Sequence, residues 1–143
     1  MSGSPRIRAG FTLVEVLIVA LVLIALAMVV VPQFSSAATD VRYGKLTARL
    51  SAARNALELY RLEHGRTYPA VETFVEQMTV ATEADGTVVP FEGAFGPYLD
   101  SIPVNPYTGT NTVSDGAAGT SAWYFNPATG EFRANDCEAH RAF

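Results

Sequence analysis

The sequence is poor in the residues on which most chemical sites depend. It has one cysteine and two histidines among 143 residues, so the chain cannot close an internal disulfide. We find no Gly-rich phosphate loop, no paired catalytic carboxylates and no Ser-His arrangement. We interpret Cys137 as a tail residue rather than a metal ligand, because we identify no second cysteine or suitably spaced histidine as its partner. Neither His64 nor His140 has an evident partner nearby in the sequence. These absences predict that the protein is not an enzyme.

Basic residues are also scarce, with 10 Lys and Arg against 14 Asp and Glu. Residues 40–66 carry a net charge of +3, whereas residues 67–143 carry −8. The arginines of the basic segment are interrupted by acids and lack an aromatic platform, so no nucleic-acid partner is expected. The opposite charges of the two segments favour packing between neighbouring subunits.

One long apolar run stands near the N-terminus, from Phe11 to Val31. As a helix it is about 31 Å long, enough to cross the hydrocarbon core of a bilayer. Its one charged side chain, Glu15, costs about 2.5 to 3.5 kcal/mol in that environment. Such a carboxylate is expected to have a positively charged partner. A backbone cut between Gly10 and Phe11 creates one, an α-amine four residues from Glu15.

Two simpler interpretations of this run remain open. A secretory signal peptide is one, with a small-residue cleavage site around Ser36-Ala37-Ala38. Against it, the apolar run exceeds the usual length of about 7 to 15 residues and contains Glu15. A plain membrane anchor in which Glu15 is incidental is the other.

A helical pattern continues beyond the apolar run. Leu46, Leu50, Ala53, Leu57 and Tyr60 recur at spacings of four and three, which places them on one face of a helix. The pattern predicts a helix from Phe11 to about His64, with Gly65 as its C-terminal stop. Pro32 and Gly44 are positions where this helix is expected to bend or melt.

The remaining residues predict a small α+β head. Val71–Val80 is expected to form a short amphipathic helix. Strands are expected at Thr110–Val113, Ala122–Phe125 and Glu131–Arg133, with a turn over residues 126–130 between the last two. Together they predict a three- or four-stranded antiparallel sheet packed on the long helix.

The stretch Gly10-Phe11-Thr12-Leu13-Val14-Glu15, followed by Pro32, resembles the type IV pilin and pseudopilin superfamily. The resemblance implies a basic leader over residues 1–10, cut after Gly10 by a prepilin peptidase, and N-methylation of Phe11. It implies that residues 11–31 are a transmembrane and filament-core helix kinked at Pro32. Residues 32–143 are then a periplasmic head that includes the amphipathic half of the helix. Glu15 is the residue expected to direct assembly.

Within this superfamily the chain is most similar to a major pseudopilin of type II secretion. The stretches 55–69 and 95–109 resemble that branch, and the single cysteine rules out the disulfide-closed loop of many surface pilins. The resemblance implies a homo-oligomeric filament. Its subunits lie in membrane lipid before assembly, and the partners expected are an inner-membrane platform, an ATPase and minor pseudopilins. The anchor is expected in the bacterial inner membrane with the head in the periplasm. A type IV pilin for adhesion, motility or DNA uptake is one alternative, and a monomeric membrane-anchored binding domain is another.

Major pseudopilins typically bind calcium through an acidic C-terminal loop, and here the sequence departs from the family. Residues 114–121 contain one carboxylate, Asp115. Calcium takes about 6 to 8 oxygen ligands, so Asp115 is a weak calcium candidate and no cofactor is expected.

Overall fold

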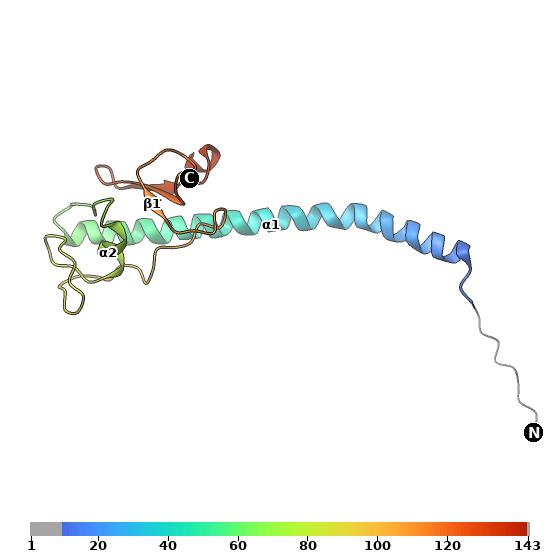
Figure 1. Ribbon diagram of the computed structural model, residues 1–143, viewed down its shortest axis with the longest axis horizontal. Coiled ribbons are helices and arrows are strands. Elements are labelled where there is room, and N and C mark those ends of the chain that lie inside the picture. The colour runs from blue at the N-terminus through green and yellow to red at the C-terminus, as the bar shows by residue number, and fades with distance from the viewer. Residues whose placement is uncertain (1–9, 143) are drawn as a thin grey trace, which may run out of the picture. The chain divides into compact units, whose positions relative to one another are not determined.

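The computed structural model describes the backbone of residues 10–142, and the side chains of the same range except those of residues 31–36. Of the leader predicted over residues 1–10, only Gly10 lies within the described residues. The elements are α1 (Leu13–Glu63), α2 (Phe74–Thr79), β1 (Val113–Ser114), β2 (Trp123–Asn126), β3 (Glu131–Ala134) and a 3-10 helix, η1 (Glu138–Ala142). One long helix with a small sheet confirms the predicted α+β class (Figure 1).

The chain divides into two units, the first ending at Asp40 and the second beginning at Val41. In the first unit, Leu13–Val30 has a mean hydropathy of 3.2 and no residue buried inside the protein. Among the residues that the structure describes, this is the one helical segment long and apolar enough to cross a membrane. The backbone of α1 is helical at both Pro32 and Gly44. The kink expected at Pro32 concerns the assembled filament and stays a prediction.

The C-terminal end of α1 is closed by backbone conformation. Gly65 has a φ of 62° and Arg66 a φ of 69°, both in the left-handed region. The Arg66 N–H donates to the Arg61 carbonyl at 2.8 Å, which is the six-to-one hydrogen bond of a Schellman cap. This confirms the predicted stop at Gly65, because a glycine reaches the left-handed region without a Cβ clash.

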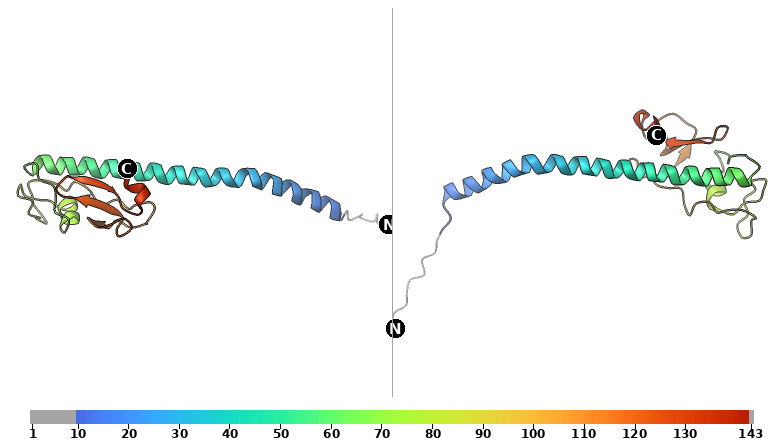
Figure 2. Two further views of the ribbon diagram at one scale, coloured as in Figure 1. Left: turned by 90° about the horizontal axis from the view of Figure 1, so that it is seen from above. Right: turned by 180° about the vertical axis from the view of Figure 1, so that it is seen from behind.

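The second unit has its core between α1 and the sheet. All five residues of the predicted helical face are at most 2% exposed, and the core is completed by aromatic side chains of α2, β2 and β3. The Phe74 and Phe125 ring centroids lie 4.6 Å apart, and those of Trp123 and Phe132 lie 5.4 Å apart. Figure 2 shows the sheet and α2 beside the C-terminal part of α1. The periodicity therefore predicted the buried face correctly.

The predicted antiparallel sheet is partly wrong. β2 and β3 are antiparallel, with Phe125 opposite Phe132, but β1 runs parallel to β2, with Val113 opposite Trp123. The intervening loop folds back on itself, because Gly119 adopts a φ of 84° and its N–H donates to the Asn135 carbonyl at 2.6 Å. The chain therefore re-enters the sheet in its original direction, which a tight hairpin does not allow.

Several element boundaries also differ from the prediction. α2 begins at Phe74 rather than Val71, and β1 is two residues long rather than four. The C-terminal residues, expected to be a polar tail, form the 3-10 helix η1.

Candidate functional site

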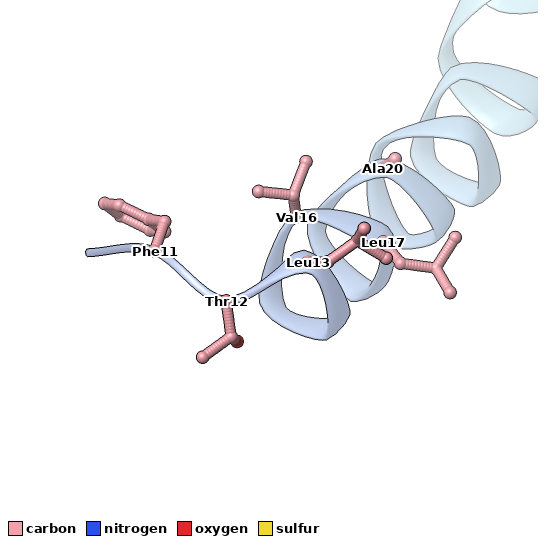
Figure 3. A pocket seen from close by; sticks show the side chains of 6 residues that line it. All are labelled: Phe11, Thr12, Leu13, Val16, Leu17 and Ala20. Carbon is pink, nitrogen blue, oxygen red and sulfur yellow. The ribbon is translucent and has the colours of Figure 1, made fainter.

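The predicted processing site lies immediately before α1. Gly10 and Phe11 precede the first helical residue, and Phe11 is 80% exposed. A Cβ added at Gly10 would meet no atom of the described residues within 4 Å. Figure 3 shows Phe11 and Thr12 on the non-helical segment that leads into the first turn. A peptidase can therefore approach the Gly10–Phe11 peptide bond without unfolding a helix.

Beside this segment is an apolar hollow of about 510 Å³ (Figure 3). It is lined by Phe11, Thr12, Leu13, Val16, Leu17 and Ala20. All six residues are exposed in the single chain. The hollow therefore presents apolar surface to whatever surrounds the helix.

Glu15 lies in the first turn of α1. Its backbone N–H donates to the Thr12 hydroxyl at 3.2 Å, so Thr12 caps the helix. Thr12 and Glu15 have the spacing of a capping box, S/T-x-x-E, a signal that the sequence analysis did not use. Within residues 10–142, no hydrogen bond or ion pair reaches the Glu15 carboxylate. The side chain is exposed, so it is available to a partner outside this chain.

His64 has partners that the sequence analysis missed. It is 4% exposed and stacks on Tyr60, with ring centroids 3.8 Å apart. The Tyr60 carbonyl, 2.8 Å from Nδ1, can only accept, so Nδ1 carries the hydrogen. Nε2 then accepts from the Thr82 hydroxyl at 3.0 Å. His64 thus joins the end of α1 to the loop that follows α2, and it has a structural role.

A second contact fixes the same loop. The Tyr98 hydroxyl donates to the Glu63 carboxylate at 2.6 Å. Burial and this carboxylate raise the pKa of Tyr98 above its ordinary value, which favours the protonated hydroxyl as the donor. A cavity of about 290 Å³ adjoins this region and is lined by Tyr60, His64, Thr67, Tyr68, Ala70, Gln77, Ala84 and Asp85.

The calcium candidate does not have the ligands that calcium favours. Asp115 is exposed and belongs to no group of three or more ligating side chains within residues 10–142. Calcium takes about 6 to 8 oxygen ligands, and the loop supplies one carboxylate. The expectation of no cofactor stays a prediction.

The C-terminal residues bring together three side chains that the sequence analysis treated as unrelated. Ligand atoms of Asp136, Cys137 and His140 all lie within 4.8 Å of one another. His140 Nδ1 is 2.6 Å from the Asp136 carboxylate, which corrects the view that His140 has no partner. The Cys-x-x-His spacing of Cys137 and His140 is the sequence signal that could have predicted their proximity.

The sequence resembles curated proteins of one kind. It is 32% identical over 106 residues to the type II secretion system core protein G of Aeromonas hydrophila, covering 71% of this chain and 69% of that protein. The same-named proteins of Klebsiella pneumoniae (30% identical, 70% and 69% covered) and Pseudomonas aeruginosa (29% identical, 71% and 70% covered) match as well. No family profile and no solved structure matches the chain.

These relatives are named as core proteins of a secretion system, and the prediction that the protein is not an enzyme is confirmed by them. The N-terminal motif had predicted the superfamily, and the stretches 55–69 and 95–109 had predicted this branch of it. The chain belongs to the type II secretion system core protein G family, and is a pseudopilin.

Proposed function

We propose that the protein is a structural subunit of a pseudopilus, a filament built from many copies of this chain in a type II secretion system. The observation that carries the proposal is the uncovered apolar segment of α1. The large apolar side chains of Leu13–Val30 are between 45% and 83% exposed in the single chain. Apolar surface of this extent is stable only when lipid or neighbouring helices cover it.

Before assembly, the covering medium is the inner membrane. Arg6 and Arg8 precede the apolar run, and the positive-inside tendency keeps such residues in the cytoplasm. The head, which begins after the run, then faces the periplasm. Prepilin peptidase cuts after Gly10 and methylates Phe11.

During assembly, neighbouring helices replace the lipid. Glu15 pairs with the α-amine of Phe11 in an adjacent subunit, which neutralises two charges where water is scarce. An inner-membrane platform and its ATPase extrude the subunits, with minor pseudopilins as further partners. The helices bundle inside, the heads lie outside, and the filament acts as a piston on the secreted protein.

The opposite charges of the basic segment, residues 40–66, and the acidic head support contacts between neighbouring subunits. Two arginines of the basic segment, however, make hydrogen bonds within their own chain. Arg54 donates from Nε to the Phe132 carbonyl at 2.8 Å, and Arg49 donates to the Val104 carbonyl. Both side chains hold the head on α1. Arg42 and Lys45 are exposed on the same helix, and they are the basic residues we assign to the acidic head of a neighbour.

Processing tests the proposal directly. Replacing Gly10 with a bulky residue, Gly10→Trp, should leave full-length precursor in the inner membrane, because the peptidase must accommodate a small residue before the cut. The measurement is the size of the chain on a blot, beside the wild type in a peptidase-deficient strain. Gly3→Trp is the matched control, since it adds the same side chain to the leader away from the cut and should be processed normally.

The N-terminus of the mature protein completes this test. It should begin at methylated Phe11. A mature chain that begins at Ala38 or Thr39 would overturn the proposal and restore the secretory-signal interpretation. A chain that is never cut would indicate a plain membrane anchor.

A further inference from the structure

We propose that Asp136, Cys137 and His140 form a binding site for a thiophilic divalent cation of the zinc type. Asp136 and Cys137 lie in the bend between β3 and η1, and His140 lies in η1, so the three residues fall within five positions of one another. They supply a carboxylate oxygen, a thiol sulfur and an imidazole nitrogen. This set of ligands suits zinc and is unlike the all-oxygen shell that calcium requires.

The distances are compatible with one ion. Tetrahedral zinc, with bonds of about 2.0 to 2.3 Å, holds its ligand atoms about 3.3 to 3.6 Å apart. The three ligand atoms here lie within 4.8 Å of one another, so side-chain rotations alone can bring them onto one ion. His140 Nδ1 and the Asp136 carboxylate are 2.6 Å apart and share a hydrogen. A bound cation takes the place of that hydrogen.

The surrounding residues hold the ligands in position, as outer-shell partners do in metal sites. The Asp136 side chain is 8% exposed, and its second oxygen accepts from Asn105 Nδ2 at 3.1 Å. Asn105 is itself fully buried and donates also to the Ala122 carbonyl. The Tyr107 ring lies against His140, with centroids 4.2 Å apart. The carboxylate and the imidazole are therefore oriented before any ion arrives.

The site is also reachable from solvent. Cys137 is half-buried, and the His140 side chain is 21% exposed. Three protein ligands leave one position of a tetrahedral ion open. Water fills that position in the single chain. By fixing η1 to the end of β3, the ion would hold the last residues of the head in place.

The test is a titration of the full-length protein in detergent, under reducing conditions, with Co²⁺ as the spectroscopic probe. We expect one Co²⁺ per chain and a thiolate-to-cobalt charge-transfer band in the near ultraviolet, which added Zn²⁺ abolishes. Cys137→Ser should remove the band. Asp136→Asn and His140→Gln should each weaken binding by at least the roughly 10- to 100-fold typical of outer-shell losses.

Glu138→Gln is the matched control, because it removes a carboxylate from the same segment but outside the three ligands, and it should leave binding unchanged. Trp123 fluorescence of each metal-free variant shows that the head is folded. Absence of the band in the wild type would overturn the proposal. So would a band that Asp136→Asn and His140→Gln leave unchanged, since that indicates adventitious binding to a lone thiol. Neither result depends on filament assembly.

Discussion

Glu15 has one role in the described structure and a second in the proposed filament, and substitutions can separate the two. In the single chain it completes the first turn of α1, where its N–H donates to Thr12 at 3.2 Å. A Thr cap contributes about 1 kcal/mol to helix stability, and a carboxylate near a helix N-terminus contributes about 0.3 to 1 kcal/mol. In the filament, Glu15 is proposed to pair with the Phe11 amine of a neighbour. Breaking a buried pair costs about 3 to 5 kcal/mol, so the pairing role is the larger one.

Three variants distinguish these roles. Thr12→Ala removes the cap and keeps the charge, whereas Glu15→Gln keeps the capping-box chemistry and removes the charge. Glu15→Val also removes the charge and keeps the cap, because the donor to Thr12 is the backbone N–H of residue 15. If pairing decides assembly, Glu15→Gln and Glu15→Val should both lose filament formation, and Thr12→Ala should retain most of it. All three should insert and be cut normally, because neither neutral side chain adds to the cost of insertion.

The assay measures filament yield by cross-linking between subunits, and secretion of the exported protein, with the cleaved chain in the membrane as the reference. Normal filament yield and secretion from Glu15→Gln would refute the pairing role. Loss of assembly in Thr12→Ala, with Glu15→Gln unaffected, would instead assign Glu15 to capping of its own helix.

Two further predictions concern α1 beyond its first turn. Leu57 is 1% exposed and Leu59 is 49% exposed, so Leu57→Ala should lower the free energy of unfolding of the head by about 2 to 5 kcal/mol, and Leu59→Ala should change it by less than about 0.5 kcal/mol. Urea unfolding followed by the fluorescence of Trp123 measures both, and equal midpoints would contradict the assigned core. Gly44→Ala should stabilise the helix by about 0.5 to 1 kcal/mol, because an added Cβ meets no atom within 4 Å. In Gly44→Ala, amide hydrogen exchange over residues 41–50 should be slower than in the wild type, and an unchanged exchange rate would contradict the predicted weak point. If melting near Gly44 is part of assembly, the variant should also yield fewer filaments.

Features that depend on neighbours in the sequence were predictable. The face that begins at Leu46 follows from a 3.6-residue period, and the stop at Gly65 follows from the conformational freedom of glycine. The turn between Asn126 and Glu131 follows from its Pro, Thr and Gly. The Gly10–Glu15 motif is equally local, and it predicted the superfamily that the relatives confirm.

Features that depend on contacts between distant residues were not predictable in the same way. The parallel pairing of β1 with β2 is accompanied by the loop hydrogen bond to Asn135, which is sixteen positions after Gly119. His64 was interpreted as a helix-end residue, because its hydroxyl partner, Thr82, is eighteen positions away. Asp136 is held by Asn105, and no periodicity links the two. In each case the polar partner is distant in the sequence and is brought close by tertiary structure.

The two units differ in where their apolar partners lie. In the head, Leu57 of α1 and Phe132 of β3 belong to one hydrophobic core, and each is 1% exposed. In the first unit, Leu13 is 83% exposed and Met28 is 73% exposed. Burying one such side chain is worth about 1.5 to 3 kcal/mol, so the whole apolar segment strongly favours being covered. The head closes its core within one chain, whereas the N-terminal helix requires lipid or other subunits. Under the proposed function, a sequence that combines these two halves remains in a membrane before assembly and leaves it for a filament, provided that the filament also supplies a partner for Glu15.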